Sequence, residues 1–346
     1  MVINKVLAIE TSCDDTSVAV VDKEGWVHSV VAASQDLEHE LYGGIVPEIA
    51  ARNHSLALIP LIEEALSKAQ CTWKDIDGIA VTNRPGLVGA LIVGLVTAKA
   101  LSQAKGIPFL GVNHLEGHLL APFLKDSQYA PPEDFGYPYV GLAISGGHTS
   151  LYQIKGLGDY KVLGTTKDDA AGECFDKFAK MAGLGFPGGV RVDQLAKSGD
   201  PTKFDFPRSM LNDSSFDMSF SGLKSSGQRM IETLGPEKVK ENLPDLCASF
   251  QEAIVDVLLA KLARAAKVYR SKRVILTGGV SANSRLRARA EEWAAKKGLT
   301  LVVPPIRYCT DNAAMIGYAG ILRMNAGEFS EMELGPSPQA LASDFK

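Results

Sequence analysis

His114 and His118 are four residues apart, which places both imidazoles on one face if this segment is helical. Two imidazoles in that arrangement can bind one metal ion. The apolar run at residues 107–112 just before them is typical of a buried strand, and α/β proteins place ligands where such strands end. Paired histidines also occur as ordinary packed or exposed helix residues, so a third ligand is needed to favour a metal site. Because the sequence holds no Cys-x-x-Cys, an aspartate elsewhere is the expected third ligand.

The segment Cys309-Thr310-Asp311-Asn312 offers such a carboxylate. It precedes a run of small and apolar residues at 313–324 that predicts a helix. The commonest role of an aspartate in front of a helix is to cap its amino terminus, and Asp311 can have that role alone. It is also the carboxylate that the two histidines require. At this point both interpretations of Asp311 are open.

The composition is that of a soluble globular protein. A chain of 346 residues suits two domains, and 46% of the residues are hydrophobic and 22% charged. The five scattered cysteines argue against a disulfide framework and favour a reducing compartment, by default the cytoplasm. The first residues lack the layout of a signal peptide. Glycines, Lys99 and small polar residues interrupt the apolar stretch at 86–104, so we expect a buried helix packed through its glycines and no membrane partner.

The net charge of -4 means that a polyanionic partner must meet a local basic patch or a second protein. One candidate patch lies at the end of an amphipathic helix predicted at 246–269. Its basic residues recur every three positions and continue beyond the helix: Lys261, Arg264, Lys267, Arg270, Lys272 and Arg273. The apolar residues expected on the inner face are Phe250, Ile254, Val257, Leu258 and Leu262. The stripe is either an ordinary solvated helix face or a docking surface for nucleic acid.

A strand, turn, strand pattern occurs twice. Residues 5–8 and 16–21 are β-rich runs joined by a polar turn, and residues 139–144 and 149–154 are joined by Ser145-Gly146-Gly147-His148. The repeat predicts a duplicated α/β protein of two domains with a central cleft, in which the two turns bind phosphates through backbone N–H groups. Taken singly, each turn is more often only a turn. We expect a linker at 125–138, a first half at 1–124 completed by a helix at about 312–346, and a second half at 136–311.

The remaining elements follow from local patterns. Apolar residues at helical spacing predict a helix at 47–68, and residues 76–81 predict a strand. In the second half, Asp168 and Asp169 are expected in the first turn of a helix, and Phe186-Pro187-Gly188-Gly189 in a loop. Residues 197–221 lack periodicity and predict an irregular insertion. A strand at 274–276, a Gly-Gly turn and a helix at 284–295 offer a nucleotide site near Asn283, followed by a strand at 301–303.

Together these residues resemble a known family. The resemblance extends in order from about residue 5 to about residue 325 and is carried by eight segments: Ile9-Glu10-Thr11-Ser12-Cys13-Asp14-Asp15-Thr16, Asn113-His114-Leu115-Glu116-Gly117-His118, Ser145-Gly146-Gly147-His148-Thr149, Asp168-Asp169-Ala170-Ala171-Gly172-Glu173, Pro187-Gly188-Gly189, Phe220-Ser221-Gly222-Leu223-Lys224, Gly278-Gly279-Val280-Ser281-Ala282-Asn283 and Cys309-Thr310-Asp311-Asn312. They look like those of bacterial TsaD, the catalytic subunit of tRNA N6-adenosine threonylcarbamoyltransferase, formerly named Gcp and described as an O-sialoglycoprotein endopeptidase. The resemblance implies a duplicated actin-like ATPase (ASKHA) fold.

The resemblance also implies the site. His114, His118 and Asp311 match the family's metal ligands, which usually hold Fe(2+) and sometimes Zn(2+). The positions that match the binding of the adenylate and threonylcarbamoyl groups are Ala143, Ile144, Ser145, Gly146, Gly147, Asp176, Gly189, Asp193 and Asn283. Archaeal and eukaryotic relatives have a tyrosine metal ligand where this chain has Ala143, which points to the bacterial type.

The implied reaction is attack by the N6 amine of the adenosine 3′ to the anticodon on L-threonylcarbamoyl-AMP, with release of AMP, in tRNAs that read codons beginning with A. The metal would act as a Lewis acid, and the turn at 145–147 would stabilise charge on the leaving phosphate. Asp14 or Glu10 is a candidate for taking the amine proton. The implied partners are tRNA, the paralogue TsaB, which pairs with the first half, and the small ATPase TsaE, while TsaC supplies the intermediate.

Two other functions fit parts of the same pattern less well. A metalloprotease needs its glutamate directly after the first histidine, whereas Glu116 is two residues after His114 and about 200° round the helix from it. A non-catalytic actin-like scaffold has no reason to keep a complete set of metal ligands. Metal content after purification would separate an enzyme from such a scaffold.

Overall fold

The computed structural model describes residues 2–42, 44–341 and 344–345, and the chain divides into two compact units. Unit 1 consists of Met1–Glu133 and Pro304–Lys346, and unit 2 of Asp134–Val303. The first boundary lies inside the predicted linker at 125–138. The division into domains stays a prediction, with a first half at 1–124 completed by about 312–346 and a second half at 136–311. The segment that carries Asp311 belongs to unit 1, as do His114 and His118.

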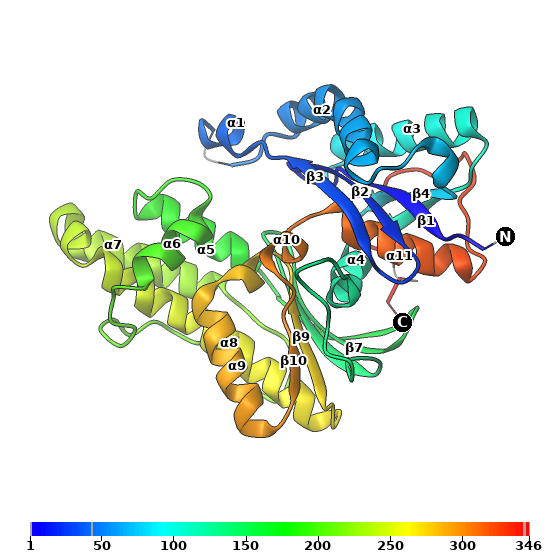
Figure 1. The fold of residues 1–346 in the computed structure, drawn as a ribbon. Helices are drawn as coiled ribbons and strands as arrows, with labels where there is room; N and C mark the ends of the chain where they lie inside the picture. Colours follow the sequence, from blue (N-terminus) through cyan, green and yellow to red (C-terminus); the bar gives the residue numbers. More distant parts are fainter. Residues whose placement is uncertain (1, 43, 342–343, 346) are drawn as a thin grey trace. The chain divides into compact units, whose positions relative to one another are not determined.

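Unit 1 is built on a five-stranded sheet of order β3-β2-β1-β4-β5 (Figure 1). Its strands are β1 (Lys5–Glu10), β2 (Thr16–Asp22), β3 (Val27–Ala33), β4 (Gly78–Arg84) and β5 (Phe109–Asn113). β2 is antiparallel to both β1 and β3, while β4 and β5 run parallel to β1. The parallel strands β1, β4 and β5 therefore end at the same edge of the sheet, and this edge carries the candidate metal site.

Helices cover both faces of this sheet, which explains why its inner strands are almost continuously apolar. The helical segments of unit 1 are α1 (Asp36–Glu40), α2 (Pro47–Lys68), η1 (Trp73–Asp75), α3 (Val88–Lys105), α4 (His114–Leu120), η2 (Ala121–Phe123), α10 (Ile306–Cys309) and α11 (Ala313–Asn325). A side chain at Gly94 of α3 would meet Ile9, and one at Gly317 of α11 would meet Ala8. Adjacent residues of a strand face opposite sides of a sheet, so α3 and α11 pack on opposite faces of β1.

Unit 2 repeats the same sheet. Its order is β10-β9-β6-β7-β8, with β6 (Tyr139–Ile144), β7 (Thr149–Gly156), β8 (Asp159–Thr165), β9 (Arg273–Thr277) and β10 (Thr300–Val302). β7 is antiparallel to β6 and β8, and β9 and β10 run parallel to β6. Read from β8, the order and directions are those of unit 1 read from β3. The duplication predicted from the two hairpins is therefore confirmed.

Helices of unit 2 surround a core rich in phenylalanine. They are α5 (Ala171–Met181), α6 (Gly188–Ala196), α7 (Ser221–Glu241), α8 (Leu243–Val268), the short η3 (Gly279–Ala282) and α9 (Ser284–Lys297). The five apolar residues predicted on the inner face of the long helix are all buried in α8. Residues 197–220 hold no helix or strand, which confirms the irregular insertion. The loop predicted at Phe186-Pro187-Gly188-Gly189 is wrong at its end, because α6 already begins at Gly188.

Helix α3 is only partly as predicted. Among the described residues, α3 is the one helix whose length and composition would allow it to cross a membrane. A side chain at Gly94 would lie 2.4 Å from the Thr11 hydroxyl, so the close packing through glycine is confirmed. Full burial is wrong, because Val88, Ile92 and Val96 are 42%, 43% and 58% exposed. These three residues follow a spacing of four and form one exposed face of the helix.

Candidate functional site

The histidine helix α4 begins where strand β5 ends. The side chain of Asn113, the last residue of β5, accepts a hydrogen bond from the Leu115 amide at 2.8 Å and so caps α4. Its amide group donates to Asp344 at 2.8 Å, and Asp344 also forms an ion pair with Arg84 at 2.6 Å. Both histidines thus lie on a short helix whose first turn is fixed by the ends of β4 and β5.

Asp311 lies between two other anchored elements. On one side, Arg307 and Tyr308 of α10 both bind Asp126, at 2.7 and 2.5 Å. On the other side, Asn312 accepts a hydrogen bond from the Met315 amide at 3.0 Å and is the cap of α11. The capping interpretation of Asp311 is therefore wrong, and its carboxylate is available for other contacts.

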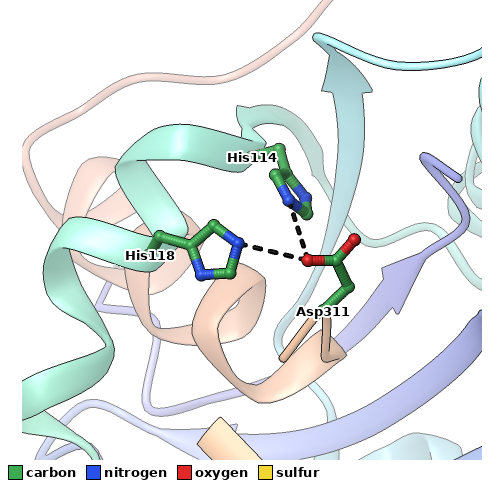
Figure 2. Close-up of side chains that lie close together, drawn as sticks. All are labelled: His114, His118 and Asp311. Atoms are coloured by element: carbon green, nitrogen blue, oxygen red, sulfur yellow. Dashed lines mark hydrogen bonds and ion pairs between the residues drawn. The ribbon is translucent and has the colours of Figure 1, made fainter. Parts of the chain in front are cut away.

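That carboxylate faces the two histidines (Figure 2). Oδ1 of Asp311 lies 3.2 Å from Nε2 of His114 and 3.2 Å from Nε2 of His118. The imidazole rings are perpendicular, with centroids 4.7 Å apart. The side chains of His114 and His118 are 7% and 1% exposed, whereas Asp311 is 27% exposed. The trio therefore opens to solvent on the aspartate side.

Burial and charge act in opposite directions on these groups. Burial would lower the pKa of His114, but Asp311 and Glu10 outweigh it and raise that pKa well above its ordinary value. Burial would raise the pKa of Asp311, but the two histidines hold it well below its usual range. For His118, burial prevails and lowers the pKa. The two carboxylates thus favour the protonated form of His114, whereas burial favours the neutral form of His118.

The same three side chains fit a divalent metal ion. One ligand atom from each residue can be chosen so that all three lie within 4.8 Å of one another, close enough for one ion to bind them. Two imidazole nitrogens and one carboxylate are the donors of many iron(II) and zinc sites, and three protein ligands leave positions open for a substrate. In addition, Nδ1 of His118 is buried and has no hydrogen-bond partner among the described residues.

Glu10 and Asp14, the two candidates for taking a proton, differ in exposure. Glu10 ends β1, is 0% exposed and lies 2.9 Å from Nδ1 of His114. Asp14 lies in the turn after β1 and is half-buried, and burial raises its pKa. Its neighbour Asp15 has its pKa raised to about 7, by burial first and then by Asp14. Sequence reasoning did not single out Asp15 or Thr82, whose hydroxyl binds Glu10.

Glu116 does not belong to this group of side chains. Its carboxylate accepts a hydrogen bond from Nε of Arg323 in α11 at 2.7 Å, and the Glu116 side chain is 4% exposed. The glutamate between the two histidines is thus engaged in an ion pair within the protein. This contact agrees with the helix-geometry argument against a metalloprotease.

In unit 2 the predicted substrate residues are linked through successive contacts. A side chain at Gly172, in the first turn of α5, would clash with the carbonyl of Ser145 at 2.6 Å, so α5 lies directly against the turn that follows Ala143 and Ile144. Asp176 of α5 accepts hydrogen bonds from the amides of Gly188 and Gly189 at 2.9 and 3.2 Å.

The contacts continue from α6 to α9. Asp193 of α6 accepts a hydrogen bond from the Ser284 hydroxyl at 2.8 Å, and Asn283 caps α9 through the Leu286 amide at 3.0 Å. Side chains added at Gly146, Gly147 or Gly279 would meet no atom within 4 Å. The turn at Gly146 and Gly147 and the turn at Gly279 therefore have open space beside their backbones.

The two acidic residues at 168 and 169 have different roles from those predicted. α5 begins at Ala171, so neither lies in the first turn of a helix. Asp168 instead accepts hydrogen bonds from the amides of Phe220 and Ser221, at 2.7 and 3.1 Å, at the start of α7. Asp169 forms ion pairs with Lys177 and Lys224 at 3.0 and 2.6 Å.

The amino-acid sequence is similar to those of known proteins. The family model of TsaD, tRNA N6-adenosine threonylcarbamoyltransferase, matches residues 27–318. The tRNA N6-adenosine threonylcarbamoyltransferase of Bdellovibrio bacteriovorus is 83% identical over 344 residues, covering 99% of this chain and 100% of that protein. The enzyme of the same name from Anaeromyxobacter dehalogenans is 50% identical, covering 96% of this chain and 98% of that protein.

Solved structures resemble the chain in fold. HypF of T. kodakarensis superposes with a TM-score of 0.61 at 13% identity, over 94% of this chain and 48% of that one. Component A of the (R)-2-hydroxyglutaryl-CoA dehydratase of Acidaminococcus fermentans gives a TM-score of 0.53 at 14% identity, over 93% and 99% of the two chains. Together with the repeated sheets, these likenesses confirm the predicted actin-like α/β fold. The family match and the full-length relatives show more than the fold: the chain belongs to the TsaD family of tRNA N6-adenosine threonylcarbamoyltransferases.

Proposed function

We propose that this chain transfers the threonylcarbamoyl group from L-threonylcarbamoyl-AMP to N6 of the adenosine 3′ to the anticodon, in tRNAs that read codons beginning with A. The amine nitrogen forms a bond to the carbamoyl carbon, the bond from that carbon to the phosphate oxygen breaks, and AMP leaves. The observation that carries the proposal is the complete His114, His118 and Asp311 trio in a chain that is 83% identical to an enzyme named for this modification.

The trio would hold one divalent metal ion, Fe(2+) or Zn(2+). Such an ion supplies a Lewis acid that binds phosphate or threonylcarbamoyl oxygens through its open positions. The partial exposure of Asp311 supports access of the substrate from that side. The near-complete burial of His118 supports its role as a ligand that solvent does not displace.

Residues of unit 2 would bind the substrate. We assign this role to Ala143, Ile144, Ser145, Gly146, Gly147, Asp176, Gly189, Asp193 and Asn283. The open space beside Gly146 and Gly147 supports close approach of a phosphate to their amides, which could stabilise the charge that AMP acquires on leaving. Asp176, Asp193 and Asn283 also hold α6 and α9 in place, because their side chains bind the amino ends of those helices.

Asp14 is our candidate for taking the proton of the attacking amine. It is half-buried, and its raised pKa makes the carboxylate a better proton acceptor than an ordinary surface aspartate. Glu10 suits this step less, because it is fully buried.

The test of the proposed function is nucleoside analysis of tRNA after incubation with the chain, TsaB, TsaE, TsaC, ATP, threonine and bicarbonate. We expect N6-threonylcarbamoyladenosine in tRNAs that read codons beginning with A, and none when this chain is omitted. Unmodified tRNA in the complete reaction would contradict the proposal. A reaction with pre-formed threonylcarbamoyl-AMP in place of TsaC separates transfer from the supply of the intermediate. A cytoplasmic location is proposed with this function.

The proposal includes TsaB as a partner that covers an apolar surface of unit 1. On the neighbouring helices α2 and α3, large apolar side chains are exposed: Leu56 and Ile59 are 70% and 50% exposed, and Val88, Ile92 and Val96 also face solvent. The residues on each helix are three or four positions apart, so they form two adjacent stripes. Apolar surface gathered in this way is typical of a protein interface.

Val96→Asp is expected to weaken TsaB binding at least about tenfold, because the complex would bury an unpaired carboxylate. Stability of the isolated chain should change by less than about 0.5 kcal/mol, since Val96 is 58% exposed. Isothermal titration calorimetry with purified TsaB measures the affinity. Val268→Asp is the matched control, because Val268 is 59% exposed and lies in unit 2. Unchanged TsaB affinity of the Val96 variant would contradict this interface.

The basic stripe predicted as a docking surface for tRNA is only partly exposed. Lys261 is 1% exposed and pairs with Asp213 at 2.6 Å, so it belongs to the interior and not to a docking surface. Arg264 and Arg273 are partly buried and bind the carbonyls of Ser215 and Asp134, at 3.4 and 2.8 Å. Lys267, Arg270 and Lys272 are exposed and remain candidates for contact with the phosphate backbone.

Replacing Lys267, Arg270 and Lys272 together by glutamate is expected to weaken tRNA binding by the partner-bound chain. The slope of log affinity against log salt should fall by about one for each of the three residues that binds a phosphate in the unsubstituted chain. Binding titrations at several salt concentrations measure both effects. Lys261→Met is the control, since it removes a charge of the same stripe from the interior and should leave the slope unchanged. An unchanged slope in the triple variant would identify the stripe as an ordinary solvated surface.

A further inference from the structure

Glu10 contacts the metal-site histidine His114 through the ring nitrogen that does not face Asp311. Oε2 of Glu10 lies 2.9 Å from Nδ1 of His114, while Nε2 of the same ring lies 3.2 Å from Asp311. Because a carboxylate only accepts hydrogen bonds, Nδ1 of His114 is the donor in this contact. The hydroxyl oxygen of Ser12 is also 3.2 Å from Nδ1. The ring is thus held from one side and presents its other nitrogen to the centre of the trio.

The register of the sheet places Glu10 beside its other partners. β1 and β4 are parallel with Ile9 opposite Val81, so the next residues, Glu10 and Thr82, meet at the carboxyl ends of the two strands. The Thr82 hydroxyl donates to Oε2 of Glu10 at 2.5 Å, and the Ser12 amide donates to Oε1 at 2.5 Å. Both carboxylate oxygens therefore have donors, and the side chain has one arrangement that satisfies them.

These contacts separate Glu10 from the reacting groups. The residue is 0% exposed, so its carboxylate has no surface with which to meet an amine of a bound tRNA. His118, in contrast, has a buried Nδ1 with no hydrogen-bond partner in the described part of the chain. Only one of the two histidines is thus oriented by a carboxylate behind it. Such outer partners of metal-bound histidines fix the tautomer and the orientation of the ring.

We infer that Glu10 is a positioning residue that holds His114 with Nε2 towards the metal, and that it does not take the proton of the substrate amine. The inference rests on the proposed metal site. It replaces the role as a base that the sequence suggested for Glu10 with a role that acts through His114. Thr82 supports the same arrangement one step further from the metal, since its only described contact with the site is through Glu10.

The test measures binding of Co²⁺ as the sole probe, with the full-length chain and without tRNA or nucleotide. Glu10→Gln removes the negative charge behind His114 and puts an NH2 donor where the carboxylate only accepted hydrogen bonds. We therefore expect it to bind Co²⁺ about 10 to 100-fold more weakly than the unsubstituted chain, the usual effect of disturbing the outer partner of a metal-bound histidine. The visible absorption of Co²⁺ should change as well, because the orientation of one imidazole ligand is no longer fixed. Circular dichroism of each metal-free variant is the control for folding.

A second variant and a matched control keep the test decisive if Glu10→Gln folds poorly. Thr82→Val removes one hydrogen bond to Glu10 and no contact with a histidine, and should weaken Co²⁺ binding by a smaller factor. Thr277→Val is the control, because Thr277 is a fully buried threonine on β9, the strand of unit 2 that corresponds to β4, and its hydroxyl has no partner among the described residues. It should bind Co²⁺ normally.

The outcomes separate this inference from the proposed function. If the unsubstituted chain binds Co²⁺ and both Glu10→Gln and Thr82→Val bind it equally well, the positioning role is overturned while the metal site stands. If Glu10→Gln loses transfer activity with unchanged Co²⁺ affinity, Glu10 acts on the substrate and the inference is again overturned. If the unsubstituted chain fails to bind Co²⁺, the metal site of the proposed function fails, and the inference with it.

Discussion

Asp311→Asn is expected to lose bound metal and tRNA modification together, while the melting temperature of the metal-free chain changes little. The amide is a much poorer ligand for a divalent cation than the carboxylate and removes one negative charge beside it. The loss of metal affinity should exceed the roughly 10 to 100-fold that follows from losing an outer partner. Stability should hold, because Glu10 still pairs with His114 and the amide can still form hydrogen bonds with the histidines.

The neighbouring residue provides the matched control for this prediction. Asn312, not Asp311, caps α11, so Asn312→Ala should lower stability by about 1 kcal/mol and leave the metal ligands in place. The two variants are therefore expected to differ in opposite ways. Asp311→Asn loses metal and keeps its stability, whereas Asn312→Ala loses stability and keeps its metal. Iron and zinc contents, thermal unfolding and tRNA modification are measured side by side. Normal metal content with normal activity in Asp311→Asn would remove the trio on which the proposed mechanism depends.

Much of the fold was predictable because the strands are apolar runs bounded by polar turns. The helix predicted at 47–68 is α2 (Pro47–Lys68), and the strand predicted at 139–144 is β6. The two hairpins were visible because each turn is short and each strand is buried. Their repetition indicated the duplication before the sheet orders were known, since strands of equal length and spacing favour equal packing.

The elements that sequence reasoning missed have weak local patterns. β3 (Val27–Ala33) and β8 (Asp159–Thr165) are edge strands with several exposed or half-exposed residues, so neither has the continuous apolar run of the inner strands. α7 contains Gly222, Gly227 and Gly235 and buries only three of its residues. Its start is capped by Asp168, which is 52 residues away in the chain. No rule based on neighbouring residues detects such a cap.

In the candidate site, too, the sequence predicts the features that are local in the chain and misses those that are not. The spacing of His114 and His118 is local, and the sequence therefore showed the pair. The choice between Asp311 and Asn312 as the cap of α11 was not local, because both types of side chain cap helices and the residues are adjacent. The contact between Glu10 and His114 joins residues 104 positions apart and arises from the register of parallel strands. Only the three-dimensional structure shows which of the two adjacent residues caps α11 and that Glu10 contacts His114.

Glu116→Ala is expected to destabilise the chain by about 2–4 kcal/mol and to leave metal content and tRNA modification intact at temperatures where the variant is folded. The Glu116 carboxylate is 4% exposed and pairs with Nε of Arg323 at 2.7 Å. Its removal leaves a partly buried guanidinium whose other ion-pair partner, Glu328, is 50% exposed. Losing one member of a buried pair is costly because the remaining charge is left without a partner away from solvent.

The matched control is Glu328→Ala, which removes the exposed partner of the same arginine and should cost less than about 1 kcal/mol. Urea unfolding measures both changes, and metal analysis with nucleoside analysis measures the site. A peptidase of the His-Glu-x-x-His kind would behave in the opposite way, because its glutamate acts as the general base and contributes little to stability. Unchanged stability of Glu116→Ala together with lost tRNA modification would contradict this structural role and place Glu116 in the chemistry of the site. Lost stability with retained activity would confine Glu116 to the packing of α4 against α11, the helix that follows Asp311.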